Sequence, residues 1–357
     1  MKLAASLLFH PLITPALMLF RLVFSLQVIF LPVISLLIVI LLTGGIALPG
    51  FSQDITIRSQ SNVVFVPVLV KDPTGQIVYG LNADDFVIQD DGVAQTIHMD
   101  DAPDAQPLSL VIVIQKGRRA NYEFARIRSL AVMLEPLFAN GQTKVALVEF
   151  DSGVKTVRDF TANFNLIEDD LEKLQPGDNG AAILDAAFLS EKLLERTPDG
   201  TQRALLLISE TRDHGSVFRK SWDEVVRALG NKNTVVTTLA FSPSLSNILD
   251  TGRGKNKDEM KAAPDLLAPF KMGAAALKKN TPRTLAAMTG GEYEPFSSER
   301  TFETRMTAFT NHLESRYQLS IQPKNPHPGL HQIRVRLKDA SNDIVLARSS
   351  YWAEGSK

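Results

Sequence analysis

Two apolar runs of this sequence are each followed by polar or charged residues with side chains suited to ionic or acid–base chemistry. Residues 108–114 (LSLVIVI) lead into a largely cationic turn made of Gln115, Lys116, Gly117, Arg118 and Arg119. Residues 203–208 (RALLLI) are followed by Glu210. A carboxylate can hold a metal ion, and arginines at the start of a helix can bind a partner's carboxylate.

A second set of residues raises the question of catalysis. The set follows residues 144–150 (KVALVEF) and Glu210, and consists of Asp151, Ser152, Asp213, His214 and Ser216. The same residue types are common in turns, where their side chains bond to nearby backbone. The first run is followed by no Walker loop or dinucleotide-binding glycines, and no Gly-x-Ser-x-Gly elbow is present. We therefore expect no catalytic residues and no enzyme, and keep a hydrolase using Asp151, Asp213 and His214 as an alternative.

The residue types that commonly hold metals do not predict a site. The chain has no cysteine, which excludes thiolate zinc sites, iron–sulfur clusters and disulfides. The six histidines are spread along the chain and none belongs to a His-Glu-x-x-His pattern, so we expect no zinc site. The segment Asp90-Asp91-Gly92 lacks the further acidic positions of a calcium loop and is typical of a hairpin turn.

Composition and charge narrow the class of protein. The 357 residues are 45% hydrophobic and 22% charged, which is typical of globular chains and excludes a disordered one. The chain has 38 Lys+Arg and 39 Asp+Glu, a net charge of -1, so it has no overall positive field to hold nucleic acid. We therefore expect no nucleic-acid partner.

Residues 1–53 differ from the rest of the chain. Residues 22–42 are apolar and long enough to span a bilayer, and the basic Lys2 and Arg21 precede them. Small and turn-forming residues follow, as in the cleavage region of a signal peptide. The segment predicts an exported protein that is periplasmic or extracellular after cleavage, or otherwise anchored in the inner membrane by residues 22–42. Met18 is an alternative start that would give a shorter basic leader.

Short alternating strands are predicted at both ends of the exported part, in residues 54–104 and 317–357. Turn residues separate the strands, as at Pro328-Gly329. Neither end is long enough to bury a core alone. We therefore expect a small β-sandwich built from the N- and C-terminal flanks.

Between the flanks, residues 105–316 alternate strands with helices, which is typical of a doubly wound, mostly parallel sheet in an α/β fold. Residues 108–114 form a continuous apolar run, as expected for a strand buried on both faces. Residues 243–280 have little periodicity and predict an insertion or long loop. Helices are predicted over residues 120–137, 163–174, 181–196, 221–229, 281–288 and 298–316.

The order of these elements resembles the von Willebrand factor A domain. The segments that carry the resemblance are LSLVIVI, NGAAILDA, RALLLISETRDHGS and LAAMTGGEYEPF. The flanks VPVLVKDPTGQIVYGLNADDFVIQDDGVAQTI and LARSSYW are similar to those of the VWFA-related proteins of Acidobacteria. The resemblance covers about residues 60–353 and implies binding to a protein or matrix partner without catalysis.

The resemblance also implies a divalent-cation site at the carboxyl edge of the sheet, and this chain departs from its ligands. The family's Asp-x-Ser-x-Ser motif falls on residues 115–119, where Gln115 replaces the aspartate and Gly117 and Arg119 replace the serines. Ala181 stands at the threonine position and Glu210 at the second aspartate position. Neighbouring lysine and arginine side chains repel a cation, so we expect no metal and no cofactor.

These observations predict an exported, non-enzymatic module for protein–protein interaction or adhesion, with a degenerate cation site. The expected partner-binding residues are Gln115, Lys116, Gly117, Arg118, Arg119, Ala181 and Glu210. The alternative is a scaffold or assembly component of an extracytoplasmic complex, in which the A-like domain only packs. In either case the membrane is contacted through the N-terminal segment if that segment is not cleaved.

Overall fold

The structure of the protein is a computed structural model, which describes most of residues 63–353. The described residues are 63–99, 106–139, 141–215, 222–231, 233–241, 280–324, 327–339 and 342–353. The apolar segment 22–42, Met18, Ser216 and most of the predicted insertion 243–280 lie outside them. Within these described residues, no helix combines the length and apolar character needed to cross a membrane.

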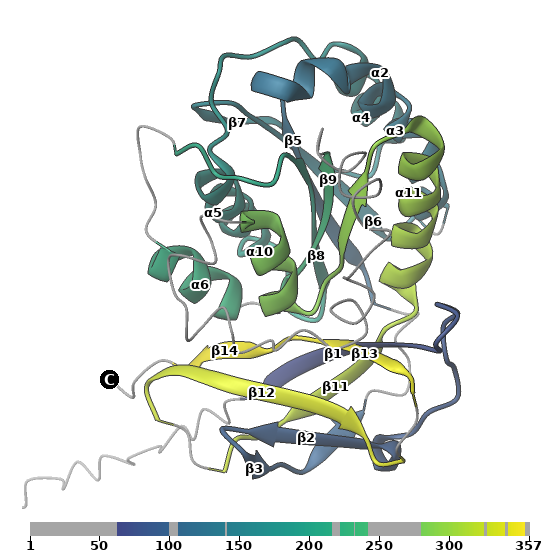
Figure 1. Cartoon of the computed structure of the whole chain (residues 1–357), viewed down its shortest axis with the longest axis vertical. Helices are drawn as coiled ribbons and strands as arrows, with labels where there is room; N and C mark the ends of the chain where they lie inside the picture. Colours follow the sequence, from purple (N-terminus) through teal and green to yellow (C-terminus); the bar gives the residue numbers. More distant parts are fainter. Residues whose placement is uncertain are drawn as a thin grey trace, which may run out of the picture. The chain divides into compact units, whose positions relative to one another are not determined.

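A six-stranded sheet with helices on both faces lies at the centre of the described chain (Figure 1). The strand order is β10-β9-β8-β5-β6-β7, and neighbours are parallel except β6 and β7. The predicted doubly wound, mostly parallel sheet is therefore confirmed. Its strands are β5 (Leu108–Gln115), β6 (Thr143–Phe150), β7 (Val154–Thr161), β8 (Gln202–Ser209), β9 (Val235–Phe241) and β10 (Tyr293–Phe296).

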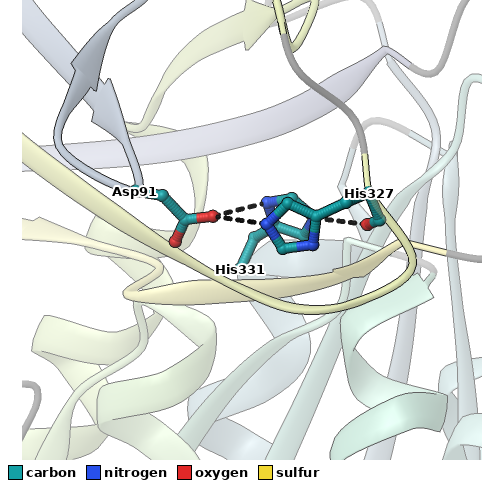
Figure 2. A group of neighbouring side chains, drawn as sticks. All are labelled: Asp91, His327 and His331. Carbon is teal, nitrogen blue, oxygen red and sulfur yellow. Dashed lines mark hydrogen bonds and ion pairs between the residues drawn. The ribbon is translucent and has the colours of Figure 1, made fainter.

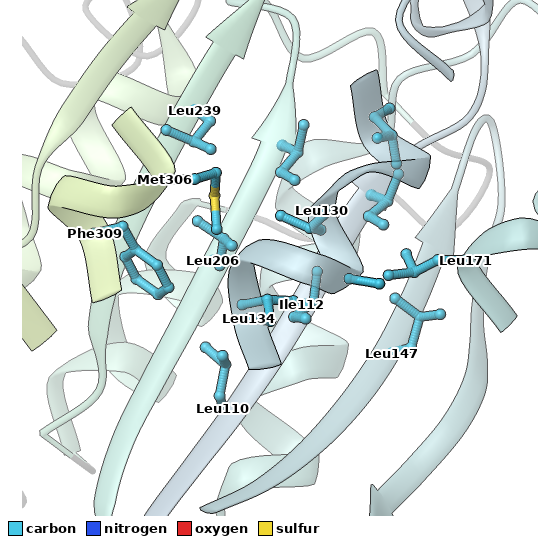
Figure 3. Packing of buried hydrophobic residues seen from close by; sticks show 14 of the residues in the cluster. Leu110, Ile112, Leu130, Leu134, Leu147, Leu171, Leu206, Leu239, Met306 and Phe309 are labelled. Carbon is cyan, nitrogen blue, oxygen red and sulfur yellow. The ribbon is translucent and has the colours of Figure 1, made fainter. Parts of the chain in front are cut away.

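The two faces of the sheet bury alternate residues of the central strand β5. On one face Leu110 and Ile112 belong to a fully apolar cluster with the helices that cover it (Figure 3). On the other face Val111 and Val113 belong to a second cluster. Burial of each such side chain stabilises the fold by about 1.5–3 kcal/mol. The helices are α2 (Phe124–Arg128), α3 (Leu130–Leu134), α4 (Phe164–Glu172) and α11 (Glu299–Glu314) on the first face, and α5 (Ile183–Leu194), α6 (Trp222–Asn231) and α10 (Thr281–Thr289) on the second.

The prediction of a single helix over residues 120–137 is wrong, because the structure has several short helices there. A 3-10 helix (Arg118–Tyr122) precedes α2 and α3, and a second one (Glu135–Phe138) follows them. The hydroxyl of Ser129 donates to the Arg126 carbonyl at 2.7 Å, and Pro136, at the start of the last turn, has no N–H to donate. The apolar spacing that suggested a helix is nevertheless used, because Ile127 and Leu130 are fully buried.

Two four-stranded antiparallel sheets form the predicted β-sandwich. Their orders are β13-β1-β11-β4 and β14-β12-β2-β3. Because β1 lies between β11 and β13, both flanks of the chain contribute to one sheet, as expected. Arg348 and Ser349 separate the last two strands of the chain, which belong to different sheets. The strands are β1 (Val64–Lys71), β2 (Phe86–Asp90), β3 (Val93–Ala94), β4 (Ile97–Met99), β11 (Tyr317–Ile321), β12 (Gly329–Leu337), β13 (Ile344–Ala347) and β14 (Ser350–Ala353).

A buried carboxylate joins the sandwich to the central domain. Lys71 Nζ in β1 lies 2.7 Å from Glu292 Oε1, and His312 Nδ1 in α11 lies 2.8 Å from Glu292 Oε2. Burial by itself raises the pKa of Glu292, but the bond with His312 and the charges of Lys71 and Arg316 outweigh it and lower this pKa to about 2. The ionised carboxylate therefore stabilises the folded protein.

We expect Glu292→Gln to lower the free energy of unfolding by about 3 kcal/mol at pH 7, because each unit of pKa shift is worth about 1.4 kcal/mol. The contribution of a lowered pKa is present above about pH 4.5 and is lost as the pH falls to about 2. The difference between variant and wild type should therefore shrink over that range in denaturant titrations. Glu303→Gln, an exposed change in α11, is the control. A difference that is independent of pH would contradict this account.

Candidate functional site

The carboxyl ends of the parallel strands gather most of the predicted site residues at one edge of the sheet. Strands β5, β6 and β8 run side by side and are parallel, so the turns that follow them are neighbours. A loop before α5 joins them there, because the Ala182 N–H donates to the Asp151 carbonyl at 2.8 Å and the His214 N–H donates to the Ala181 carbonyl at 2.9 Å. This edge is called the crevice below.

Gln115 ties two backbone segments of the crevice together. Its side chain is fully buried. Its Oε1 accepts a hydrogen bond from the Glu210 N–H at 2.8 Å, and its Nε2 donates to the Gly117 carbonyl at 3.1 Å. The amide thus links the end of β8 to the turn after β5, and neither end of the amide faces a ligand.

Glu210 is paired with an arginine of the same chain. Arg118 Nε lies 2.9 Å from Glu210 Oε1, and His214 Nε2 lies 3.3 Å from the same oxygen. The Glu210 side chain is 8% exposed and that of Arg118 is 32% exposed. A divalent cation needs several oxygen ligands, some of them anionic. The carboxylate that the A-domain resemblance places at a ligand position has a guanidinium beside it, so these residues do not fit a divalent cation.

The backbone around Gly117 is packed too closely to leave an open recess. A Cβ at Gly117 would lie 2.5 Å from the Gly180 carbonyl oxygen and 2.6 Å from that of Asp178. A Cβ at Gly180 would lie 2.2 Å from the Ser152 nitrogen. The Arg118 N–H donates to the Asp178 carbonyl at 2.9 Å, which holds the loop in place. The loop at residues 177–180 therefore packs directly against the turns that follow β5 and β6.

Lys116 is also neutralised within the chain. Its Nζ lies 3.2 Å from Glu149 Oε1 and 3.5 Å from Asp151 Oδ2. Burial lowers the pKa of Lys116, but its bond to Glu149 and the charges of Glu149 and Asp151 outweigh that effect and raise the pKa above its usual value. Lys116 is thus a charged structural contact. Arg119, by contrast, is exposed to solvent.

The two aspartates considered for catalysis fix the conformation of loops. Asp151 accepts hydrogen bonds from the N–H groups of Gly153 at 3.0 Å and Asp178 at 3.3 Å. Asp213 accepts from Leu184 at 3.2 Å, in the first turn of α5, and from Gly215 at 3.1 Å. Both aspartates therefore satisfy backbone donors, which is the turn role that these residue types commonly have.

Asp178, which was not among the predicted site residues, orders the turn after β6. The Ser152 hydroxyl and N–H both bond to its carboxylate, and the Gly180 N–H donates to it at 2.7 Å. The hydrogen bond from the Ser152 hydroxyl is the main reason that the pKa of Asp178 is lowered. The run PGDNG was the available signal for this turn, but nothing in it indicates which loop it packs against.

The expected helix start at residues 116–119 is corrected by the structure. The first turn there is the five-residue 3-10 helix Arg118–Tyr122, and α2 begins only at Phe124. Arg118 itself has a φ of 53°, in the left-handed region. A turn of this length provides no extended helix dipole, so any anion contact at the crevice depends on the arginine side chains.

Among known proteins, the chain is similar only to solved structures. No model of a known protein family matches the chain, and no curated protein matches it. Similar structures include the von Willebrand factor type A protein of Catenulispora acidiphila, 11% identical over 77% of this chain and 75% of that one, with a TM-score of 0.42. A point mutant of the PilB minor pilin of Streptococcus sanguinis is 12% identical over 60% of this chain, with a TM-score of 0.40. This chain spans 63% of that pilin structure.

A third similar structure is the vWF domain of the type V pili tip protein Mfa5 from Porphyromonas gingivalis. The two chains are 8% identical, the match covers 58% of this chain and 96% of the Mfa5 chain, and the TM-score is 0.38. Identities at this level concern fold alone. Within the chain itself, the sheet order with β5 at its centre, the antiparallel edge strand β7 and helices on both faces agree with the predicted von Willebrand factor A-like fold.

We expect Arg118→Ala to lower the free energy of unfolding by about 1–3 kcal/mol, because it leaves the carboxylate of Glu210 without its guanidinium. Combined with Glu210→Gln, the loss should be smaller than the sum of the single losses, which denaturant titrations in a double-mutant cycle measure. Arg119→Ala, the matched exposed change, should alter stability by less than about 0.5 kcal/mol. Additive single losses would show that the Arg118–Glu210 pair contributes nothing.

Proposed function

We propose that this chain is an exported, non-enzymatic interaction module that binds a protein or matrix partner without a divalent cation. The observation that carries the proposal is the ion pair between Arg118 and Glu210. It places a positive charge where the A-domain resemblance implies a metal ion. Export is inferred from the apolar residues 22–42 of the sequence.

The exposed charge at the crevice suits an acidic group of a partner. Lys116 and Arg118 are neutralised by carboxylates of the same chain. Arg119, after β5, and Arg212, after β8, are exposed in neighbouring turns. Arginine binds carboxylates in a bidentate manner and keeps its charge at all physiological pH values. These two side chains are therefore the proposed contacts, and the remaining predicted residues support the turns that carry them.

The absence of enzymatic activity is part of the same proposal. Catalytic acids and bases need free access to a substrate and an orientation toward it. The carboxylates of Asp151 and Asp213 accept backbone hydrogen bonds, and Glu210 is paired with Arg118. A hydrolase using Asp151, Asp213 and His214 would have to give up contacts that hold the loops.

A specific observation favours the alternative of a scaffold. The close approach of Gly117 and Gly180 to neighbouring backbone leaves little recess for a partner's side chain. In that case the domain would only pack within an extracytoplasmic complex, and its exposed arginines would be solvated.

The full chain should show no saturable heat when titrated calorimetrically with Mg²⁺ or Ca²⁺ at millimolar concentration. The reason is that the guanidinium of Arg118 repels a cation at Glu210. Glu210→Ala, titrated in parallel, removes the only carboxylate at the family's ligand positions. Saturable binding that Glu210→Ala abolishes would overturn the cation-independent module and restore metal-dependent adhesion.

Cross-linking in the cell envelope should separate recognition from packing. In the double variant Arg119→Ala plus Arg212→Ala, the amount of cross-linked partner should fall at least tenfold compared with wild type. The reason is that the proposed contacts are removed while the buried core is unchanged. Its melting temperature should equal that of wild type. Arg300→Ala, an exposed change in α11, is the matched control and should retain the partner. Retention by the double variant would favour the scaffold.

A further inference from the structure

Two histidines and an aspartate meet on the β-sandwich, away from the crevice (Figure 2). Asp91 occupies the tight turn between β2 and β3, where its φ is 47°. His331 is in β12, and His327 comes just before that strand. Asp91 is fixed against β12, because its N–H donates to the Gln332 carbonyl and its Oδ1 accepts from the Gln332 N–H, both at 2.9 Å.

The nitrogen and oxygen atoms of these side chains converge. His331 Nδ1 lies 2.9 Å from Asp91 Oδ2, and His327 Nε2 lies 3.3 Å from the same oxygen. Each of the three side chains has one nitrogen or oxygen atom that could bind a metal, and these three atoms all lie within 4.8 Å of one another. In a tetrahedral site with metal–nitrogen distances of about 2.0–2.1 Å, neighbouring ligand atoms are about 3.3 Å apart. The spacing of the cluster is therefore close to that of a ligand set.

The hydrogen bonding of His331 determines which nitrogen faces the cluster. His331 Nε2 lies 2.7 Å from the His327 carbonyl oxygen, which can only accept, so Nε2 carries a proton. The lone pair of a neutral His331 ring is then on Nδ1. A bond from the outer ring nitrogen to a carbonyl is the arrangement that orients metal-binding histidines in proteins.

The inner nitrogen of His331 is buried and lacks a satisfactory partner. The His331 side chain is 1% exposed, and among the described residues its Nδ1 makes no aligned hydrogen bond. Asp90 Oδ1, which is also buried and makes no aligned hydrogen bond in that part of the chain, lies 3.3 Å from it. Nδ1 therefore faces two carboxylate oxygens, an arrangement that is favourable when a metal ion or a proton lies between the nitrogen and the oxygens.

We propose that Asp91, His327 and His331 bind one Zn²⁺ ion. Two imidazole nitrogens with a carboxylate suit zinc, whereas Mg²⁺ and Ca²⁺ prefer oxygen ligands throughout. The ring of His327 stacks on that of His331 at 4.0 Å between centroids, so it must turn to direct Nε2 at the ion. Its side chain is 62% exposed and has room to turn. Water or Asp90 Oδ1 supplies the fourth ligand.

Asp90 and Tyr351 support this site from within the sandwich. The Tyr351 hydroxyl donates to Asp90 Oδ2 at 3.0 Å, and the Tyr351 ring stacks on His331 at 4.6 Å between centroids. These contacts hold His331 on the side away from His327. The bound ion would connect the β2–β3 turn to the start of β12 and so stabilise that edge of the sandwich.

Only part of this site could be recognised in the sequence. His327 and His331 are four residues apart, but Pro328 and Gly329 lie between them, so the pair is not on a helix face. The expectation of no zinc site considered the histidines as scattered. Only the pairing of β12 with β2 brings Asp91, more than two hundred residues earlier, to the same place.

The test is a calorimetric titration of the full chain, purified without a histidine tag, with ZnCl₂. We expect one saturable site per chain and a higher melting temperature with zinc. His327→Ala should weaken binding at least tenfold without unfolding the protein, because that side chain is exposed. Asp91→Asn, which is compatible with the positive φ of the turn, should also weaken binding. His98→Ala, an exposed histidine in β4, should bind as wild type.

Two results would overturn the proposal. One is the absence of saturable zinc binding, with NMR showing a proton on His331 Nδ1, which would make the cluster a buried imidazolium paired with carboxylates. The other is zinc binding that His327→Ala and Asp91→Asn leave unchanged. Glu210→Ala should not alter zinc binding, so the failure of this site and the failure of the cation-independent crevice are separate results.

Discussion

The guanidinium of Arg348, buried between the sandwich and the central domain, constrains how both are built. Removing such a charge from water costs several kcal/mol unless its donors are satisfied. Its nitrogens reach the carbonyl oxygens of Ser350 at 2.9 Å, Gly230 at 3.0 Å and Phe65 at 3.3 Å, and Asn233 Oδ1 at 2.8 Å. Burial lowers the pKa of Arg348 to about 10, so the group is charged at neutral pH. Acceptors from β1, from β14 and from the end of α6 must therefore meet around one side chain.

The charged side chains of the crevice are also satisfied by groups of the same chain. Its basic and acidic side chains are matched within the chain, as in the pairs of Arg118 with Glu210 and Lys116 with Glu149. Partly buried pairs of this kind orient loops more than they add stability. Arg119, which follows the same strand, is exposed to solvent beside these pairs.

The sequence predicts the layers well because they depend on local patterns. The apolar run of β5 indicates burial on both faces, and Asn163 and Ser298 stand at the helix starts that they cap. The site is less accessible to such reasoning. Which carboxylate pairs with Arg118 depends on the side-by-side ends of β5 and β8, and the meeting of His331 with a turn far earlier in the chain depends on strand register. Neither contact can be inferred from any short segment of the sequence.

The pairing of β1 with β11 and β13 has a consequence for how the chain is made. During synthesis, β1 emerges roughly 250 residues before the strands on either side of it, and contacts so distant in sequence form slowly. Until then a strand with five fully or nearly fully buried apolar side chains has no partner and is prone to associate with other chains. The sandwich can therefore close only after the last strands of the chain have been made.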